Sequence, residues 1–143
     1  MKHFIILIIS LLTLKAELEF AQPIPSMESP RQVMFTITEG EPRAIHHVLS
    51  SANNILKAYG PENIEMKIVV YYDGMKALLK KNREFTVRVD ALMQYDVEFV
   101  ACRNTMQTKK IKESDLIDDV SIVQAGIMEL IERSKDGWIN IKP

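Results

Sequence analysis

The chain has a single cysteine, Cys102, among 143 residues, so it cannot form an internal disulfide bond. One cysteine and three histidines provide no spacing typical of a zinc site, and no C-x-x-C pair. The sequence also lacks the glycine-rich and serine motifs G-x-G-x-x-G, the P-loop and G-x-S-x-G. These absences remove the usual grounds for dinucleotide, nucleoside triphosphate or serine-hydrolase chemistry. The net charge of −1 gives no basic excess, and we expect no nucleic-acid partner.

The N-terminus is typical of a secretory signal. The basic segment Met1–His3 precedes the apolar run Phe4–Leu14, which is shorter than the roughly 20 residues of a membrane-spanning helix. We expect residues 1–21 to be a signal peptide, cleaved after Ala16 or Ala21, and a periplasmic or otherwise extracytoplasmic location. The alternatives are an uncleaved anchor, which would place the chain at the membrane, and an amphipathic extension.

The rest of the chain predicts a proline-containing linker at 22–32 and one folded domain at 33–143, with 47% hydrophobic and 26% charged residues overall. Apolar runs and helical periodicity alternate along the domain. The expected strands are 33–38, 64–72, 97–102, 120–122 and 138–141, and the expected helices are 43–59, 75–81, 84–95, 104–109 and 123–134, the last with Ile127, Leu130 and Ile131 on one face. This order predicts an α/β fold, a three-layer α/β/α sandwich with a mostly parallel sheet of about five strands.

Cys102 ends a buried-strand pattern, and a helix is expected to begin directly after it. Ligands bind at the carboxyl ends of strands in open α/β sheets, so a thiol at this position is a candidate catalytic group. The positive end of a helix and the neighbouring Arg103 would both lower the pKa of the thiol. The alternative is a thiol that points into the core and stays inert.

Polar residues follow the other expected strands at the same edge. The candidate binding residues are Glu39 after the first strand, Tyr72 and Asp73 after the second, and Arg103, Asn104 and Thr105 after the third. Which of them converge depends on the strand order, which the sequence leaves open. No metal site is expected, since His46 and His47 point about 100° apart on a helix.

Residues 33–143 resemble the DsrE/DsrF-like family, most strongly from Cys102 onward. The resemblance rests on Val100–Met106, Asp115-Leu116, Ala125–Leu130 and Gly137–Ile139, in this order and spacing. It implies a three-layer α/β/α fold, and a sulfur carrier in which the residue at position 102 holds sulfur as a persulfide. It also implies trimers or hexamers, sulfur donor and acceptor proteins as partners, and no metal or organic cofactor.

We therefore expect a sulfur-relay protein in which the backbone N–H groups of Asn104 and Thr105 hold the terminal sulfur and Arg103 balances its charge. Two alternatives remain at this stage. One is a non-catalytic oligomeric domain that binds a small ligand or acts as a scaffold. The other is a redox sensor that forms an intermolecular disulfide through Cys102, which suits an oxidising compartment.

Overall fold

The five strands in the described part of the chain form one parallel sheet. The computed structural model describes residues 18–143, so the expected signal peptide lies almost wholly outside the described residues. The strands are β1 (Arg31–Ile37), β2 (Ile64–Val70), β3 (Glu98–Cys102), β4 (Ser121–Val123) and β5 (Ile139–Ile141). Their order across the sheet is β4-β3-β2-β1-β5, and every neighbouring pair is parallel. The predicted parallel α/β fold is confirmed.

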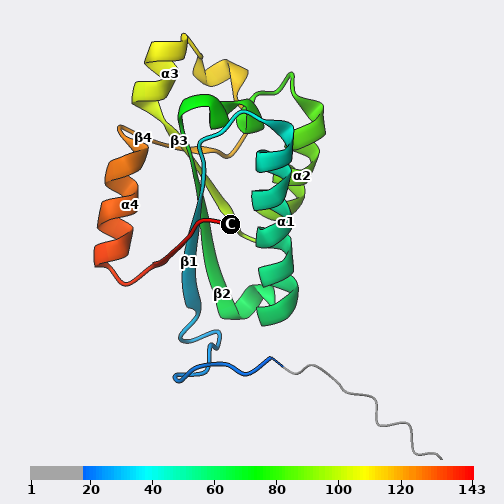
Figure 1. Cartoon of the computed structure of the whole chain (residues 1–143), viewed down its shortest axis with the longest axis vertical. Helices are drawn as coiled ribbons and strands as arrows, with labels where there is room; N and C mark the ends of the chain where they lie inside the picture. Colours follow the sequence, from blue (N-terminus) through cyan, green and yellow to red (C-terminus); the bar gives the residue numbers. More distant parts are fainter. Residues whose placement is uncertain (1–17) are drawn as a thin grey trace, which may run out of the picture.

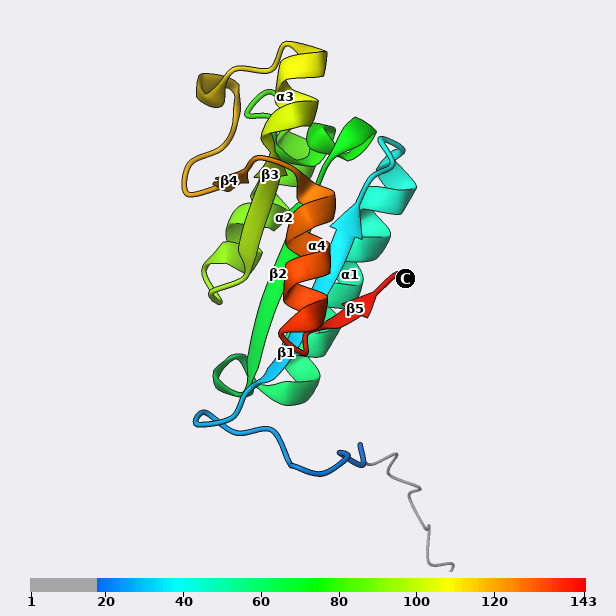
Figure 2. The same ribbon diagram turned by 90° about the vertical axis from the view of Figure 1, so that its left-hand side faces the viewer.

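The helices cover the two faces of this sheet unequally. The α-helices are α1 (Pro42–Tyr59), α2 (Arg83–Met93), α3 (Arg103–Lys109) and α4 (Gly126–Lys135), and the 3-10 helices are η1 (Pro61–Asn63), η2 (Tyr72–Leu78) and η3 (Glu113–Asp115). Figure 1 shows α1 and α2 on one face, α4 on the other, and α3 at the carboxyl end of β3. In Figure 2, α4 lies in front of the central strands and is the α-helix that covers this face of the sheet.

Alternating side chains of the central strands build a separate core on each face. The larger core, between the sheet and α1 and α2, includes Phe35 and Phe99, each 0% exposed. The smaller core, beneath α4, contains Met34, Val69 and Leu130. The C-terminal parts of β2 and β3, Ile68–Val70 and Phe99–Cys102, are buried and continuously apolar, as is typical of parallel sheets covered on both faces.

The fourth α-helix differs from its sequence prediction. It begins at Gly126 rather than at 123, because Val123 pairs with Cys102 as the end of β4. Only Leu130 of the expected apolar face is buried, whereas Ile127 and Ile131 are 56% and 59% exposed. Positions 127, 130 and 131 lie on one side of the helix, as predicted, but the sheet covers only the edge of this side that carries Leu130.

The segment before the sheet is held against the domain. The Arg31 guanidinium donates hydrogen bonds to the carbonyl oxygens of Ala21 and Pro23, at 2.9 and 3.0 Å. The ring of Phe20 lies 4.9 Å from that of Tyr59 at the end of α1. Within residues 18–143, no helix has the length and hydropathy needed to cross a membrane.

The chain turns sharply after β2 and packs its backbone directly against the end of β1. The N–H of Tyr71 donates to the carbonyl oxygen of Ile37 at 3.2 Å, and the N–H of Gly74 donates to that of Thr38 at 3.0 Å. A Cβ atom on Gly74 would lie 2.0 Å from the carbonyl oxygen of Ile37. Only glycine permits this approach, so the turn Tyr71–Gly74 has a fixed position relative to β1.

We expect Gly74→Ala to lower the free energy of unfolding by about 2 kcal/mol or more, because the backbone must move to admit a methyl group. Urea denaturation followed by circular dichroism measures this loss. Gly137→Ala is the control: that position has a φ of +93° but open space around it. The control should lose only about 1 kcal/mol from its backbone conformation. Equal losses in the two variants would contradict the steric explanation.

Candidate functional site: a cradled thiol at the end of β3

The candidate site is centred on Cys102, the last residue of β3. Its backbone is extended, with φ −93° and ψ 115°, and α3 begins at the next residue. The residue is 5% exposed and lies beside Val123 of β4. The predicted position of the thiol, at the carboxyl end of a buried strand, is the position observed.

Four donor groups around the sulfur stabilise its thiolate form. Burial raises the pKa of Cys102, but the Thr105 hydroxyl and the backbone N–H groups of Gly126, Thr105 and Asn104 lower it by more. The net pKa of the thiol is below its ordinary value. A larger fraction of Cys102 is therefore a thiolate at neutral pH than of a free cysteine, and the thiolate is the nucleophilic form.

The Thr105 hydroxyl is oriented by a second hydrogen bond. Its oxygen accepts from the backbone N–H of Tyr72 at 3.1 Å. This bond occupies a lone pair of the oxygen and leaves the hydroxyl hydrogen available to Cys102. Tyr72 has a φ of +55°, a backbone conformation that is rare for an aromatic residue. The turn after β2 thus positions the strongest donor to the sulfur.

Two helix N-termini meet at the thiol. Gly126 is the first residue of α4, and its N–H reaches the sulfur from the β4–α4 connection. The connection is tied to α3, because the N–H of Asn104 donates to the carbonyl of Gln124 at 3.1 Å and the Gln124 amide donates to the Asn104 side chain at 2.6 Å. The Asn104 N–H thus also donates to Gln124, and of the four donors it lowers the pKa of the thiol least.

The start of α4 packs closely against the end of β2, and the glycine at position 126 favours this approach. A Cβ atom at this position would lie 3.0 Å from the ring of Tyr71 and 3.2 Å from the Val69 side chain. A larger residue would therefore require these two side chains to shift by a few tenths of an ångström.

The sequence-predicted binding residues divide into two groups. Asn104, Thr105 and Tyr72 lie at the thiol, while Asp73 pairs with Lys109, whose ammonium lies 5.1 Å from the centre of the Tyr72 ring. The expectation that Arg103 balances the charge on the sulfur is not supported by its contacts. Its guanidinium forms an ion pair with Glu113 at 2.9 Å.

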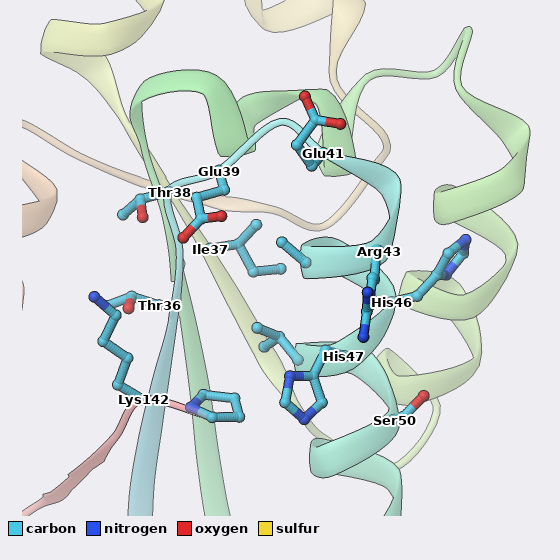
Figure 3. Close-up of a pocket in the computed structure, with 13 residues that line it drawn as sticks. Thr36, Ile37, Thr38, Glu39, Glu41, Arg43, His46, His47, Ser50 and Lys142 are labelled. Carbon is cyan, nitrogen blue, oxygen red and sulfur yellow. The ribbon is translucent and has the colours of Figure 1, made fainter.

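Glu39 lies in a different part of the molecule. It lines an open cavity of about 640 Å³ between the end of β1, the start of α1 and the residues after β5 (Figure 3). In the described part of the chain, no hydrogen bond or ion pair connects its carboxylate with the donors around Cys102. Strand order explains the separation, because β2 lies between β1 and β3.

Sequence reasoning missed two groups that act on the sulfur, the amide of Gly126 and the hydroxyl of Thr105. Gly126 was placed inside a predicted helix, although a glycine after a short strand and before an apolar helix is a signal for close backbone approach. For Thr105 only the backbone N–H was considered. In residues 18–143, no group of three or more histidine, cysteine or acidic residues is arranged to hold a metal ion.

Fold and site together define a parallel α/β protein with one cradled thiol at a strand end. The chain belongs to the DsrE/DsrF-like family, whose model matches residues 32–143.

Solved structures share the fold. A protein of unknown function, MTH1491 from Methanobacterium thermoautotrophicum, is 26% identical, with 79% of this chain and 99% of that chain covered and a TM-score of 0.75. The ychN protein from E. coli has a TM-score of 0.67 at 14% identity, with 78% and 99% covered, and is similar in fold. No curated protein matches the chain significantly.

We expect Thr105→Val to raise the pKa of Cys102, because it removes the hydroxyl that lowers this pKa more than any of the backbone donors does. A hydrogen bond to a charged group contributes about 1.5 kcal/mol or more, so alkylation by iodoacetamide at neutral pH should slow about tenfold. The rate measured against pH separates a changed pKa from changed access. Thr105→Ser is the matched control, because it keeps the hydroxyl and should behave like the wild type. A pH profile of Thr105→Val that coincides with the wild-type profile would contradict this role of the hydroxyl.

Proposed function

We propose that the protein is a sulfur carrier that holds sulfur transiently as a persulfide on Cys102. The observation that carries the proposal is the set of hydroxyl and amide donors around a single thiol whose pKa is lowered. Membership of the DsrE/DsrF-like family supports it. The reaction requires only an activated thiol, so the chain's own residues are sufficient for it.

The transfer is a thiol–persulfide exchange. The Cys102 thiolate attacks the outer sulfur of a donor persulfide, R–S–S⁻. A new S–S bond forms at Cys102 as the S–S bond of the donor breaks, and the donor leaves as a thiolate. An acceptor thiolate then attacks the outer sulfur on Cys102 in the same way and releases the Cys102 thiolate. Each step exchanges one S–S bond for another, so no external oxidant or reductant is consumed.

The cradle suits this chemistry because its donors are neutral. Arg103 and Lys109 are paired with Glu113 and Asp73, so the charge on the sulfur is balanced by hydrogen bonds and not by an adjacent cation. Fixed dipoles stabilise the thiolate before the reaction and the persulfide anion after it. A tight ion pair with an arginine would instead have to be broken when the outer sulfur leaves.

We also propose that the chain self-associates through α4. Ile127, Met128 and Ile131 are 56%, 60% and 59% exposed on the one helix that covers this face of the sheet. Adjacent exposed apolar side chains of this size are typical of a contact surface. The surface begins one residue after Gly126, so a second copy of the chain would lie close to the cradled thiol.

The function is tested by the intact mass of the folded protein before and after exposure to a small persulfide donor. We expect the gain of one sulfur atom, reversed by a thiol reductant and absent in Cys102→Ser. The variant is a close control because serine keeps the size and hydrogen bonding of the site but lacks a nucleophilic thiol. The measurement reports sulfur uptake directly and needs no knowledge of the natural donor.

Two outcomes would overturn the proposal. One is a folded wild-type protein that gains no sulfur, and the other is a Cys102→Ser variant that gains as much as the wild type. Non-reducing electrophoresis after mild oxidation adds a further test. A covalent dimer formed without any sulfur adduct would favour a disulfide-forming redox role over sulfur transfer.

For self-association, we expect Ile127→Glu combined with Ile131→Glu to lower the sedimentation coefficient toward that of a monomer, because two carboxylates would be buried at the contact. Val87→Glu is the matched control. Val87 is 54% exposed on α2, on the opposite face of the sheet, and should leave assembly unchanged. A monomeric wild-type protein at micromolar concentration would contradict the expectation.

A further inference from the structure

A second candidate site lies at the opposite side of the sheet from β4, independent of Cys102. It is the open cavity of about 640 Å³ introduced above, here called the edge cavity. It exists because β5 pairs only with Val33–Phe35, so the last residues of β1 pair with β2 on one side and have no strand on the other. Its walls come from the end of β1, the first turns of α1 and the two residues that follow β5 (Figure 3). Its volume is in the range of small-molecule sites, about 300–1,000 Å³.

The position of this cavity is where a parallel α/β sheet offers a ligand site. The chain proceeds from β1 to β2, β3 and β4 in one direction, then returns through α4 to place β5 on the other side of β1. The strand order therefore reverses between β1 and β5. In open α/β sheets, ligands bind outside the carboxyl ends of the strands at this reversal. The edge cavity lies at the carboxyl end of β1, beside the residues that follow β5.

Charged side chains line the cavity from both walls. Figure 3 shows the Glu39 carboxylate entering from the end of β1, and Arg43 and His47 entering from α1. Lys142, which follows β5, adds a second cation to the lining on the side of β1. Ile37 and Val48, which are 2% and 7% exposed, provide an apolar floor between the two walls. Across residues 18–143, neither Glu39 nor Arg43 forms an ion pair.

Unlike Glu39 and Arg43, the neighbouring His46 has partners within the protein. His46 also lines the edge cavity, but its Nδ1 accepts from Arg88 at 2.8 Å and its Nε2 lies 3.7 Å from Glu84. Because Arg88 and Glu84 belong to α2, these contacts of His46 connect α1 with α2. The charged groups that enter the cavity from opposite walls have no comparable internal partner and are available to a ligand.

We propose that the edge cavity binds a small zwitterion of the amino-acid class, with its ammonium group at Glu39, its carboxylate at Arg43 and His47, and an apolar side chain on the floor. Arginine and a carboxylate form two parallel hydrogen bonds, which fixes the orientation of that end. A molecule with a single charge would pair with the charged side chains of only one wall of the cavity. The proposal concerns a site other than the thiol and does not rest on the sulfur-carrier function.

The test is isothermal titration calorimetry of the protein with three probes of similar shape. Leucine carries both charges, 4-methylpentanoate lacks the amine, and 3-methylbutylamine lacks the carboxylate. We expect leucine to bind and each singly charged probe to bind at least about tenfold more weakly, since each loses charge-assisted hydrogen bonds. No measurable heat with leucine at millimolar concentration, or equal affinities for leucine and either analogue, would overturn the proposal.

Variants assign the binding to these residues. Glu39→Gln and Arg43→Met should each weaken leucine binding about tenfold, while circular dichroism shows an unchanged fold. Glu132→Gln is the matched control, because Glu132 is an exposed carboxylate on α4 that does not line the edge cavity. Unchanged binding in both Glu39→Gln and Arg43→Met would overturn the proposal, as would an equal loss in Glu132→Gln. None of these variants should alter the pH dependence of Cys102 alkylation.

Discussion

The parallel pairing of all five strands is the constraint on which the rest of the structure depends. Parallel neighbours cannot be joined by a hairpin, so each strand must return through a crossover that covers a face of the sheet. The carboxyl ends of the strands then share one edge, and every loop that follows a strand begins there. Cys102, the turn Tyr71–Gly74 and the edge cavity are all at this edge, although they come from distant parts of the chain.

The cradle around Cys102 is an assembly of three such loops. The turn after β2 orients the Thr105 hydroxyl, α3 contributes its own first amides, and the β4–α4 connection adds the amide of Gly126. Neutral hydrogen bonds dominate over nearby cations, which are paired with carboxylates. Fixed dipoles are screened by salt less than exposed charges are, so we expect salt to change the pKa of the thiol less than it would if an exposed cation lowered that pKa.

Much of the architecture could be predicted from the sequence because the signals are local. The alternation of apolar runs with helical periodicity predicted the strands and helices, and it placed Cys102 at a strand end. The same reasoning could not identify Gly126, because its contact with Cys102 depends on which strand lies beside β3. Pairing is a long-range property, and β4 has only three residues from which to recognise it.

Two expectations about side chains differ from the structure, each because a local pattern does not show which residues lie nearby in space. Arg103 was expected to serve the thiolate because it is adjacent in sequence, but a long side chain at the start of α3 finds Glu113 of η3 instead. Ile127 and Ile131 were grouped with Leu130 because apolar residues at helical spacing usually face a core. A single helix over one face of the sheet buries only one stripe, and the second stripe of α4 is left on the surface.

The turn Tyr71–Gly74 contacts both regions of the functional edge. Its Gly74 N–H donates to the carbonyl of Thr38, a residue that lines the edge cavity, and its Tyr72 N–H donates to Thr105 at the thiol. The close approach of Gly74 to Ile37 leaves this turn no room to move independently of β1. A displacement of the end of β1 would therefore also displace the donor that orients Thr105. The two sites are separated by β2, and this one turn forms hydrogen bonds to residues of both.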